Sequence, residues 1–254
     1  LVIHLDNLGK EQPKDATLED LQAFMDNLAK KNYTAKSISR KTNSTKTFFR
    51  FLKSQGAVVD DPAQGLTHPK FENKPPRILS KTEYRALRDA ARADKRIFAV
   101  IELLLQTGIR IGELASLRVE DIVVGKESTL HVPQFEGTRE RTIPLNASAG
   151  EATSKYLEVR PKSPSHTLFI TKTGRPLLIR NIRAAIDRYF RIAGIKNSKV
   201  NDLRHTWVAY QLQAGASLVT VSKLAGHKRL STTEKYLPFI IGANGSSKIK
   251  LEEL

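Results

Sequence analysis

Residues 60–79 limit the possible folds of this chain more than any other segment. Their sequence, DDPAQGLTHPKFENKPPRIL, contains four prolines and shows little hydrophobic periodicity. Proline fixes its own backbone angle and lacks an N–H donor, so a segment of this kind interrupts helices and sheets. We interpret it as a linker. The full length of 254 residues is enough to form a hydrophobic core on each side of it.

The segment before the linker, residues 1–59, is predicted to be a small helical domain. Residues 17–20, Thr-Leu-Glu-Asp, have the pattern of a capping box at the start of a helix. A second helix is expected over about 34–55, with Gly56 as its C-terminal stop. The first helix carries apolar residues at helical spacing, namely Leu21, Phe24, Met25 and Leu28.

The second of these helices is strongly basic. From Lys30 to Lys53 there are eight Lys and Arg residues and no Asp or Glu. One stripe is suited to packing and consists of Ile38, Thr42, Thr45, Phe49 and Leu52. The basic residues expected to contact DNA phosphates are Lys36, Arg40, Lys46, Arg50 and Lys53. The alternative is a basic face that meets only solvent. The absence of acidic residues over this length favours phosphate contact.

Residues 80–254 are predicted to form one larger domain. It opens with a second capping box, Ser-Lys-Thr-Glu at 80–83, and helical patterns dominate it. The expected helices cover about 80–93, 96–107, a segment containing Arg110 that runs to about Leu117, 179–193, 201–214 and 218–224. Extended patterns at 130–132 and 142–145 predict a hairpin, and a short extended pair is expected around 172–174. The predicted fold class is mainly α with a small antiparallel β-sheet.

The charge of the chain indicates a polyanionic partner. Lys and Arg number 42 against 26 Asp and Glu, which gives a net charge of +16. We expect nucleic acid rather than a membrane, because no run of about 18 apolar residues is present. The lack of cysteine excludes disulfides, thiol nucleophiles and thiolate metal sites. Without a signal-peptide pattern, the expected location is the cytoplasm.

Four residues that suit chemistry on a phosphodiester stand in short strings. Arg110 lies in Thr-Gly-Ile-Arg-Ile-Gly-Glu-Leu and Arg204 in Asp-Leu-Arg-His-Thr. His227 lies in Leu-Ala-Gly-His-Lys, and Tyr236 follows nine residues later at the end of Ser-Thr-Thr-Glu-Lys-Tyr. Arginine binds two phosphate oxygens at once and stays protonated. A phenol needs nearby cations to attack at neutral pH. Arg110 alone would more often be a surface arginine paired with Glu113, and Arg204 alone would more often be structural. For His227 the alternative is a helix cap and for Tyr236 a buried aromatic residue, but the set suits attack by a phenol oxygen.

These strings and their order resemble the tyrosine recombinase (integrase) family, nearest in character to its Xer-like, phage-integrase and transposon-resolvase branches. The resemblance covers nearly the whole chain. It implies a two-domain DNA clamp. Residues 1–59 would be a helical, SAM-like core-DNA-binding domain, residues 60–79 a linker, and residues 80–254 an integrase-like catalytic domain.

The resemblance also implies roles for these residues. Arg110 and Arg204 would hold the scissile phosphate, and His227 would form a hydrogen bond to it and help in proton handling. Tyr236 would attack it, giving a 3′-phosphotyrosyl bond and a free 5′ hydroxyl. His205, next to Arg204, would support the site by packing or hydrogen bonding.

The resemblance further implies how the protein works. Its partner would be double-stranded DNA with specific recombination sites. Strand exchange would proceed through a Holliday junction in a homotetramer on paired sites, with accessory DNA-bending proteins as further partners. No cofactor, metal or membrane is expected, and the location would be the nucleoid of a prokaryotic cytoplasm.

Two positions depart from the pattern of this family. The family has a histidine three residues before its second arginine, where this chain has Asn201, which can hydrogen-bond but not titrate. The family also has a lysine on the hairpin turn as general acid, where this chain has Glu136. A slipped register offers Arg139 or Arg141, and Lys126 on the preceding turn is the only nearby lysine. Our hypothesis is that Arg139 occupies the DNA groove, and the general acid is left unassigned.

Residues from about 237 onward are expected to form a tail that docks on a neighbouring subunit. Its apolar part would be Phe239, Ile240 and Ile241. We expect deletion of residues 242–254 to weaken the pairing of two sites more than binding to one site. The alternative is a frayed terminus.

Two other functions are compatible with the sequence. One is a DNA-binding protein on the same fold that has lost catalytic power, although a binding module has no need for the tyrosine. The other is a type IB topoisomerase, which would relax any supercoiled plasmid rather than exchange strands between defined sites.

Overall fold

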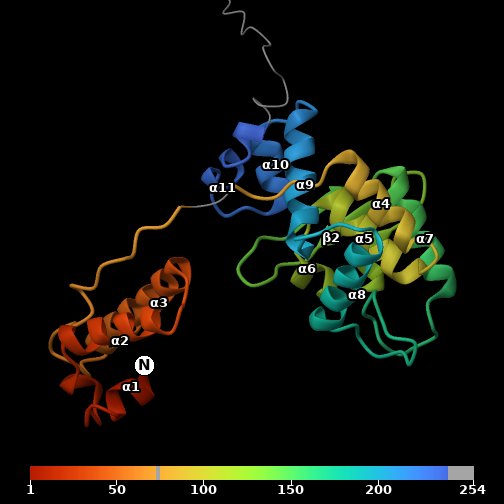
Figure 1. The fold of residues 1–254 in the computed structure, drawn as a ribbon. Coiled ribbons are helices and arrows are strands. Elements are labelled where there is room, and N and C mark those ends of the chain that lie inside the picture. Colours follow the sequence, from red (N-terminus) through yellow and green to blue (C-terminus); the bar gives the residue numbers. More distant parts are fainter. Residues whose placement is uncertain (73–74, 240–254) are drawn as a thin grey trace, which may run out of the picture. The chain divides into compact units, whose positions relative to one another are not determined.

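The structure is a computed structural model that describes residues 1–72 and 75–239. The chain divides into two compact units, Leu1–Lys74 and Pro75–Leu254, and the division falls inside the proline-containing segment (Figure 1). None of the helices in the described part is long and apolar enough to cross a membrane.

The first unit consists of helices. They are α1 (Val2–Asp6), a short 3-10 helix (Pro13–Asp15), α2 (Leu18–Lys30) and α3 (Ala35–Ser54). The capping box at the start of α2 is present, because Thr17 Oγ1 accepts from Asp20 N at 3.3 Å and the Asp20 carboxylate accepts from Thr17 N at 2.9 Å. Helix α3 ends before Gly56, whose φ of +69° is the left-handed conformation that glycine favours.

The core of the first unit lies between α2 and α3. The buried apolar residues of these helices are Leu21, Met25, Leu28, Ile38 and Phe49. Ala63 and Leu66, from the segment after α3, belong to the same core. Phe49 is fully buried, and removal of such a ring costs about 3–5 kcal/mol. The stripe predicted to pack on α3 therefore does so, with Thr42 and Thr45 buried and Leu52 half-buried.

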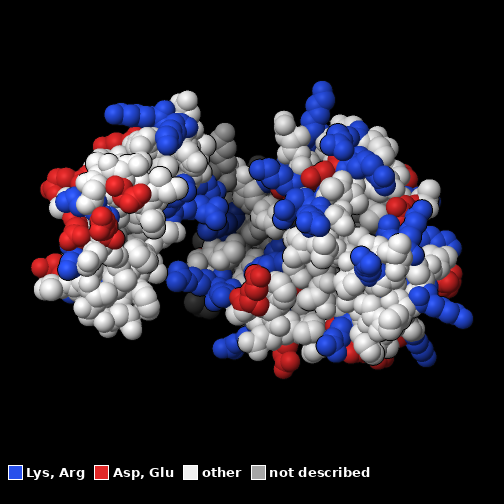
Figure 2. Space-filling model, turned by 90° about the horizontal axis from the view of Figure 1, so that it is seen from below, with Lys and Arg blue, Asp and Glu red and all other residues white. Residues whose placement is uncertain are grey.

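The basic residues of α3 lie mainly on its solvent side. Lys36, Arg40, Arg50 and Lys53 are exposed, whereas Lys46 is half-buried and donates to Gln64 O at 3.1 Å. In this unit Asp and Glu gather towards the left edge in Figure 2, and Lys and Arg are concentrated elsewhere. On the face shown, the acidic and basic side chains therefore overlap only in part.

The second unit combines eight helices of the described residues with a small sheet. The helices are α4 (Lys81–Ala91), α5 (Lys95–Thr107), α6 (Ile111–Ser116), α7 (Ala147–Val159), α8 (Ile179–Ile192), α9 (Val200–Gln213), α10 (Leu218–Ala225) and α11 (Ser231–Glu234), beside a 3-10 turn (Val119–Asp121). The strands are β1 (Ile122–Val123), β2 (Thr129–Val132) and β3 (Arg141–Pro144). The predicted fold class, mainly α with a small antiparallel sheet, is confirmed.

Helix α5 is the centre of the main core. Its sequence is almost continuously apolar, and it packs against α4, α7, α8 and α9. The sheet has the order β1-β2-β3 with antiparallel pairing, and Leu130 lies opposite Ile143 with both side chains buried. This pairing holds the loop between β2 and β3 at a fixed place beside the helices (Figure 1).

A separate apolar cluster joins α9, α10 and the segment around α11, which lie together in Figure 1. Its buried members are Trp207, Val208, Ala209, Leu212, Val221, Ala225 and Tyr236. Through this cluster the end of the described chain is packed onto α9, the helix that carries Arg204.

Helix α7, strand β1 and the short helix α11 were not predicted, and Arg110 was placed wrongly. Helix α7 is rich in Ala, Ser and Gly, so its hydrophobic periodicity is weak, although Asn146 caps it. Strand β1 has only two residues. Arg110 does not lie within a helix, because Gly108 ends α5 in the left-handed conformation and α6 begins only at Ile111.

Candidate active site

A cavity of about 490 Å³ in the second unit brings the predicted residues together. Its wall includes Arg110, Asn201, Arg204, His227 and Tyr236. These residues come from the α5–α6 junction, from α9 and from the segments on either side of α11. His205 and Glu136 also line the cavity, together with Arg183, which the sequence analysis did not single out.

Arg110 occupies the N-cap position of α6 and its side chain crosses to a distant loop. Its Nη2 donates to Gly226 O at 2.9 Å, and its Nη1 donates to Glu113 Oε1 at 3.3 Å. Its side chain remains 34% exposed, so part of the guanidinium is free to meet a ligand in the cavity. The sequence also offered a surface pair between Arg110 and Glu113 as an alternative, but Glu113 is fully buried.

Glu113 ties the hairpin to the site. Its carboxylate accepts from Arg141 Nη1 at 3.0 Å and Arg141 Nη2 at 2.9 Å, and from the Arg110 backbone N at 2.7 Å. Burial raises the pKa of Glu113, but the bonds from Arg141 and Arg110 outweigh burial and hold the pKa below its usual value. Arg141 also donates to Leu224 O at 2.6 Å. Its guanidinium is therefore engaged inside the protein.

Arg204 is buried, with only 5% of its surface exposed. Its Nη1 donates to Gly108 O, while its Nη2 is buried and has no hydrogen-bond partner among the described residues. Burial, reinforced by Arg110, lowers the pKa of Arg204 to about 10, so the group stays charged at neutral pH. A buried N–H without a partner costs free energy, and an anion in the cavity would satisfy it.

Tyr236 is 3% exposed and packs in the apolar cluster with Trp207. Its hydroxyl lies 2.5 Å from His205 Nδ1. Burial raises the pKa of the phenol, and the charge of Arg204 opposes this shift. The hydroxyl therefore holds its proton at neutral pH, and attack requires a group that can take the proton away.

His205 stands between the tyrosine and Asn201. Its Nε2 lies 2.9 Å from Asn201 Nδ2. Burial lowers the pKa of His205, so its imidazole is neutral at pH 7. If the Asn201 amide donates, Nδ1 carries the ring proton. If the amide is turned so that its oxygen accepts, Nδ1 is free to accept from Tyr236.

His227 follows the left-handed Gly226 that ends α10. Its Nδ1 lies 2.8 Å from Thr233 Oγ1. Burial, followed by the charges of Arg204 and Arg110, lowers the pKa of His227 to about 4. The imidazole is therefore neutral at pH 7 and acts as a hydrogen-bonding group rather than as a cation. Its backbone N, not its side chain, bonds to α10, at Ser222 O.

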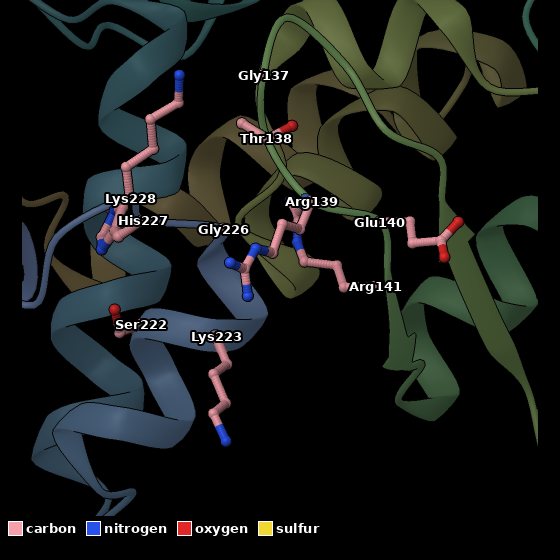
Figure 3. A pocket seen from close by; sticks show the side chains of 10 residues that line it. All are labelled: Gly137, Thr138, Arg139, Glu140, Arg141, Ser222, Lys223, Gly226, His227 and Lys228. Carbon is pink, nitrogen blue, oxygen red and sulfur yellow. The ribbon is translucent and has the colours of Figure 1, made fainter.

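The loop between β2 and β3 turns at Glu136 and Gly137, which both have positive φ. Glu136 is exposed and lines the cavity of Tyr236. Arg139 is exposed and lines a second cavity, of about 700 Å³, shown in Figure 3. His227 lines both cavities. Lys126 is exposed in the turn between β1 and β2 and lines neither of the two.

Residues 77–238 match the Phage integrase family, and residues 2–56 match the Phage integrase, N-terminal SAM-like domain. Tyrosine recombinase XerC of Staphylococcus carnosus is 32% identical over 231 residues, which cover 88% of this chain and 77% of that protein. Tyrosine recombinase XerC of Chlorobaculum parvum is 30% identical over 270 residues, covering 91% of this chain and 77% of that protein.

Solved structures show the same fold. XerA recombinase matches with a TM-score of 0.63 and 24% identity, over 97% of this chain and 89% of that chain. XerH site-specific recombinase bound to a palindromic difH substrate matches with a TM-score of 0.76 and 18% identity, over 92% of this chain and 72% of that chain. The matched catalytic and SAM-like domains, together with relatives at 30% identity or above across most of the chain, place this protein in the phage integrase family of tyrosine recombinases.

Proposed function

We propose that this chain is a site-specific DNA recombinase in which Tyr236 attacks a DNA phosphodiester. The observation that carries the proposal is the buried Arg204. Arg204 lines the same cavity as Tyr236, and its Nη2 has no hydrogen-bond partner among the described residues. A fixed cation aimed at a phosphate stabilises the charge that develops on the oxygens during attack. Arg110, partly exposed on the same wall, supplies a second fork for the same phosphate.

His227 is the third residue of the proposed phosphate-binding site, beside Arg110 and Arg204. It is neutral, and Thr233 fixes its ring through Nδ1. When the threonine hydroxyl donates to Nδ1, Nε2 carries the ring hydrogen and donates to a non-bridging phosphate oxygen.

We assign His205 as the group that receives the phenol proton. It is neutral and its Nδ1 is 2.5 Å from the phenol oxygen. With the Asn201 oxygen accepting from Nε2–H, Nδ1 presents its lone pair to Tyr236. Asn201 then acts through His205, as a positioning residue. It does not take over proton transfer from the histidine that the family has at this position.

The rest of the molecule is assigned to DNA binding and assembly. The α3 residues Lys36, Arg40, Lys46, Arg50 and Lys53 contact phosphates of the recombination site, and Arg139 enters the groove from the hairpin. The two units clamp the duplex, and four protomers on paired sites exchange strands through a Holliday junction, with accessory DNA-bending proteins. Such an enzyme meets its substrate in the nucleoid of a prokaryotic cytoplasm.

The C-terminal tail is assigned to docking between protomers. Phe239 packs partly against the cluster around Trp207. Ile240, Ile241 and residues 242–254, on which the deletion experiment depends, lie outside the described residues.

The experiment is a covalent trap. The protein is mixed with nicked duplexes tiled from the DNA beside its own gene, and SDS-resistant adducts are resolved on a gel, with Tyr236→Phe alongside. The proposal predicts an adduct that disappears in the variant. Tight, sequence-specific binding to a duplex without any adduct would contradict it and favour a binding protein. Relaxation of any supercoiled plasmid would favour a type IB topoisomerase.

A further inference from the structure

Attack by Tyr236 on a DNA phosphate leaves the 5′ oxygen of the cleaved strand without a proton. When the Tyr236 oxygen bonds to phosphorus, the P–O5′ bond breaks and its electron pair stays on the 5′ oxygen. An alkoxide is a poor leaving group in water, so a proton donor beside O5′ accelerates such a step by about 10²–10⁴-fold. The donor must lie on the side of the phosphate away from the tyrosine, because attack and departure are in line.

The residues that hold the phosphate are poorly suited to this task. Arg110 and Arg204 are already assigned to the non-bridging oxygens of the phosphate, on the wall that also carries Tyr236. His227 has a pKa of about 4 and is neutral. Glu136, the turn residue of the hairpin that lines the cavity, would be a carboxylate beside a phosphate. Within the hairpin loop, residues 133–140, the sequence contains no lysine.

Lys228 brings an ammonium group to the hairpin turn from another part of the chain. It follows His227 directly, and a Cβ placed on Gly137 would stand 3.0 Å from Lys228 Nζ. The side chain is exposed, and its Nζ forms no ion pair among the described residues. In Figure 3 the Lys228 side chain extends towards the top of the view, where Gly137 lies, whereas the Lys223 side chain extends towards the bottom.

Lys228 and Tyr236 line different cavities, and these two cavities share His227. Tyr236 lines only the cavity of about 490 Å³, and Lys228 lines only the cavity of about 700 Å³. His227 lines both, and the turn residues Glu136 and Gly137 line one each. The nucleophile and the ammonium of Lys228 thus reach His227 from different cavities, as attack and departure on opposite sides of a phosphate would require.

We propose that Lys228 is the general acid of strand cleavage, supplied by the loop after α10 in place of a residue of the hairpin. This inference rests on the proposed function. Lys228 Nζ gives a proton to O5′ as the P–O5′ bond breaks, while the phenol proton passes to His205 Nδ1. In the reverse step the neutral amine takes the proton of the attacking 5′ hydroxyl, and His205 returns a proton to Tyr236.

The test replaces the 5′-bridging oxygen of the scissile phosphate with sulfur, in the duplex that gives the Tyr236-dependent adduct. A thiol has a pKa of about 8.5, against about 15.7 for water, so a thiolate leaves without protonation. On the oxygen substrate we expect Lys228→Ala and Lys228→Arg to cleave about 10²–10⁴-fold more slowly than the unaltered chain. On the sulfur substrate both variants should cleave at close to the unaltered rate. Lys228→Arg keeps the positive charge and so separates proton donation from charge.

Two controls make the result specific. Arg204→Ala, which acts on the phosphate oxygens, should be slow on both substrates. Lys126→Ala, which removes the lysine of the turn between β1 and β2, should cleave both substrates at the unaltered rate. The assignment of Lys228 would be overturned if Lys228→Ala slowed cleavage of the oxygen and sulfur substrates equally, or did not slow cleavage of the oxygen substrate. Either result would leave the Tyr236 adduct, and so the proposed function, intact. If the unaltered chain formed no Tyr236-dependent adduct on either substrate, the proposed function would fail and Lys228 with it.

Discussion

The contact between His205 and Tyr236 is the detail of the site that most directly concerns reactivity. A buried phenol with a raised pKa needs a base, and His205 Nδ1 is 2.5 Å away. We expect His205→Ala to slow adduct formation about 10²-fold or more while leaving duplex affinity unchanged. Asn201→Ala, which removes only the amide that contacts His205 Nε2, should slow adduct formation less. The measurement is the single-turnover rate on a nicked duplex, and equal rates for His205→Ala and the unaltered chain would exclude this role.

The depressed pKa of His227 predicts a pH dependence of stability. Its pKa is about 4 in the folded chain, against about 6.5 for an unperturbed histidine. Between these values the unfolded chain binds a proton that the folded chain does not, so stability falls as pH falls from about 6.5 to about 4. His227→Gln removes this contribution but leaves the smaller one of His205, which has the same sign.

Trp207 gives a direct measurement of this effect. It is the single tryptophan of the chain and lies in the cluster beside the site. Urea midpoints from its fluorescence at pH 7 and pH 5 should differ more for the unaltered chain than for His227→Gln. The same difference in both proteins would mean that His227 is not the titrating group.

Single residues were the part of the site best anticipated from sequence, because short strings carry them. Arg110, Arg204, His227 and Tyr236 line one cavity, as their common chemistry suggested. The sequence around Lys228 did not indicate a role for this lysine. Its closeness to Gly137 depends on how α10 packs against the hairpin. The burial of Glu113 and its contact with Arg141 were not anticipated, because the i,i+3 spacing between Arg110 and Glu113 indicates neither.

The junction between α5 and α6 depends on Gly108. It ends α5 with a φ of +64°, its carbonyl accepts from Arg204, and a Cβ there would stand 2.3 Å from Trp207 Cε3. We expect Gly108→Ala to destabilise the second unit by more than the roughly 1–2 kcal/mol of left-handed backbone strain alone. The ring of Trp207 must move to accept the methyl group, and its fluorescence should change.

Gly194 supplies a matched control. Its φ is +71°, in the same unit, and nothing lies within 4 Å of a Cβ placed on it. Gly194→Ala should therefore show the backbone strain without the clash. Equal shifts of the Trp207 unfolding midpoint for the two variants would mean that the junction tolerates the methyl group.

Elements with strong local signals were predicted well, and those without were missed. Helix α3 was expected at about 34–55 and spans Ala35–Ser54, because Thr34 caps it and Gly56 follows it. Helix α7 was missed because its small residues leave little periodicity, and tertiary packing against α5 stabilises it instead. Arg110 was placed inside a helix because a Gly-x-x-x-Gly spacing does not show which glycine adopts a positive φ.

The charge of the whole chain predicts how it binds DNA. Each phosphate contact that is lost should reduce the slope of log K against log salt by about 0.9. We expect the double variant Arg40→Ala, Arg50→Ala to bind its duplex more weakly. The magnitude of its slope should fall by about 0.9 for each of the two lost contacts. Lys14→Ala, an exposed cation in the 3-10 helix of the same unit, should leave the slope unchanged. Titrations at several salt concentrations measure this, and an unchanged slope in the double variant would mean that α3 faces only solvent.

The central claim is that Tyr236 becomes covalently attached to the 3′ end of a cleaved DNA strand. The most direct measurement is to digest the trapped complex with protease and nuclease, identify the nucleotide-bearing peptide by mass, and test whether the released 5′ end accepts a phosphate label without prior dephosphorylation. The account predicts a nucleotide on Tyr236 and a 5′ end that is labelled at once. A nucleotide on any other residue, or a 5′ end already carrying phosphate, would contradict it.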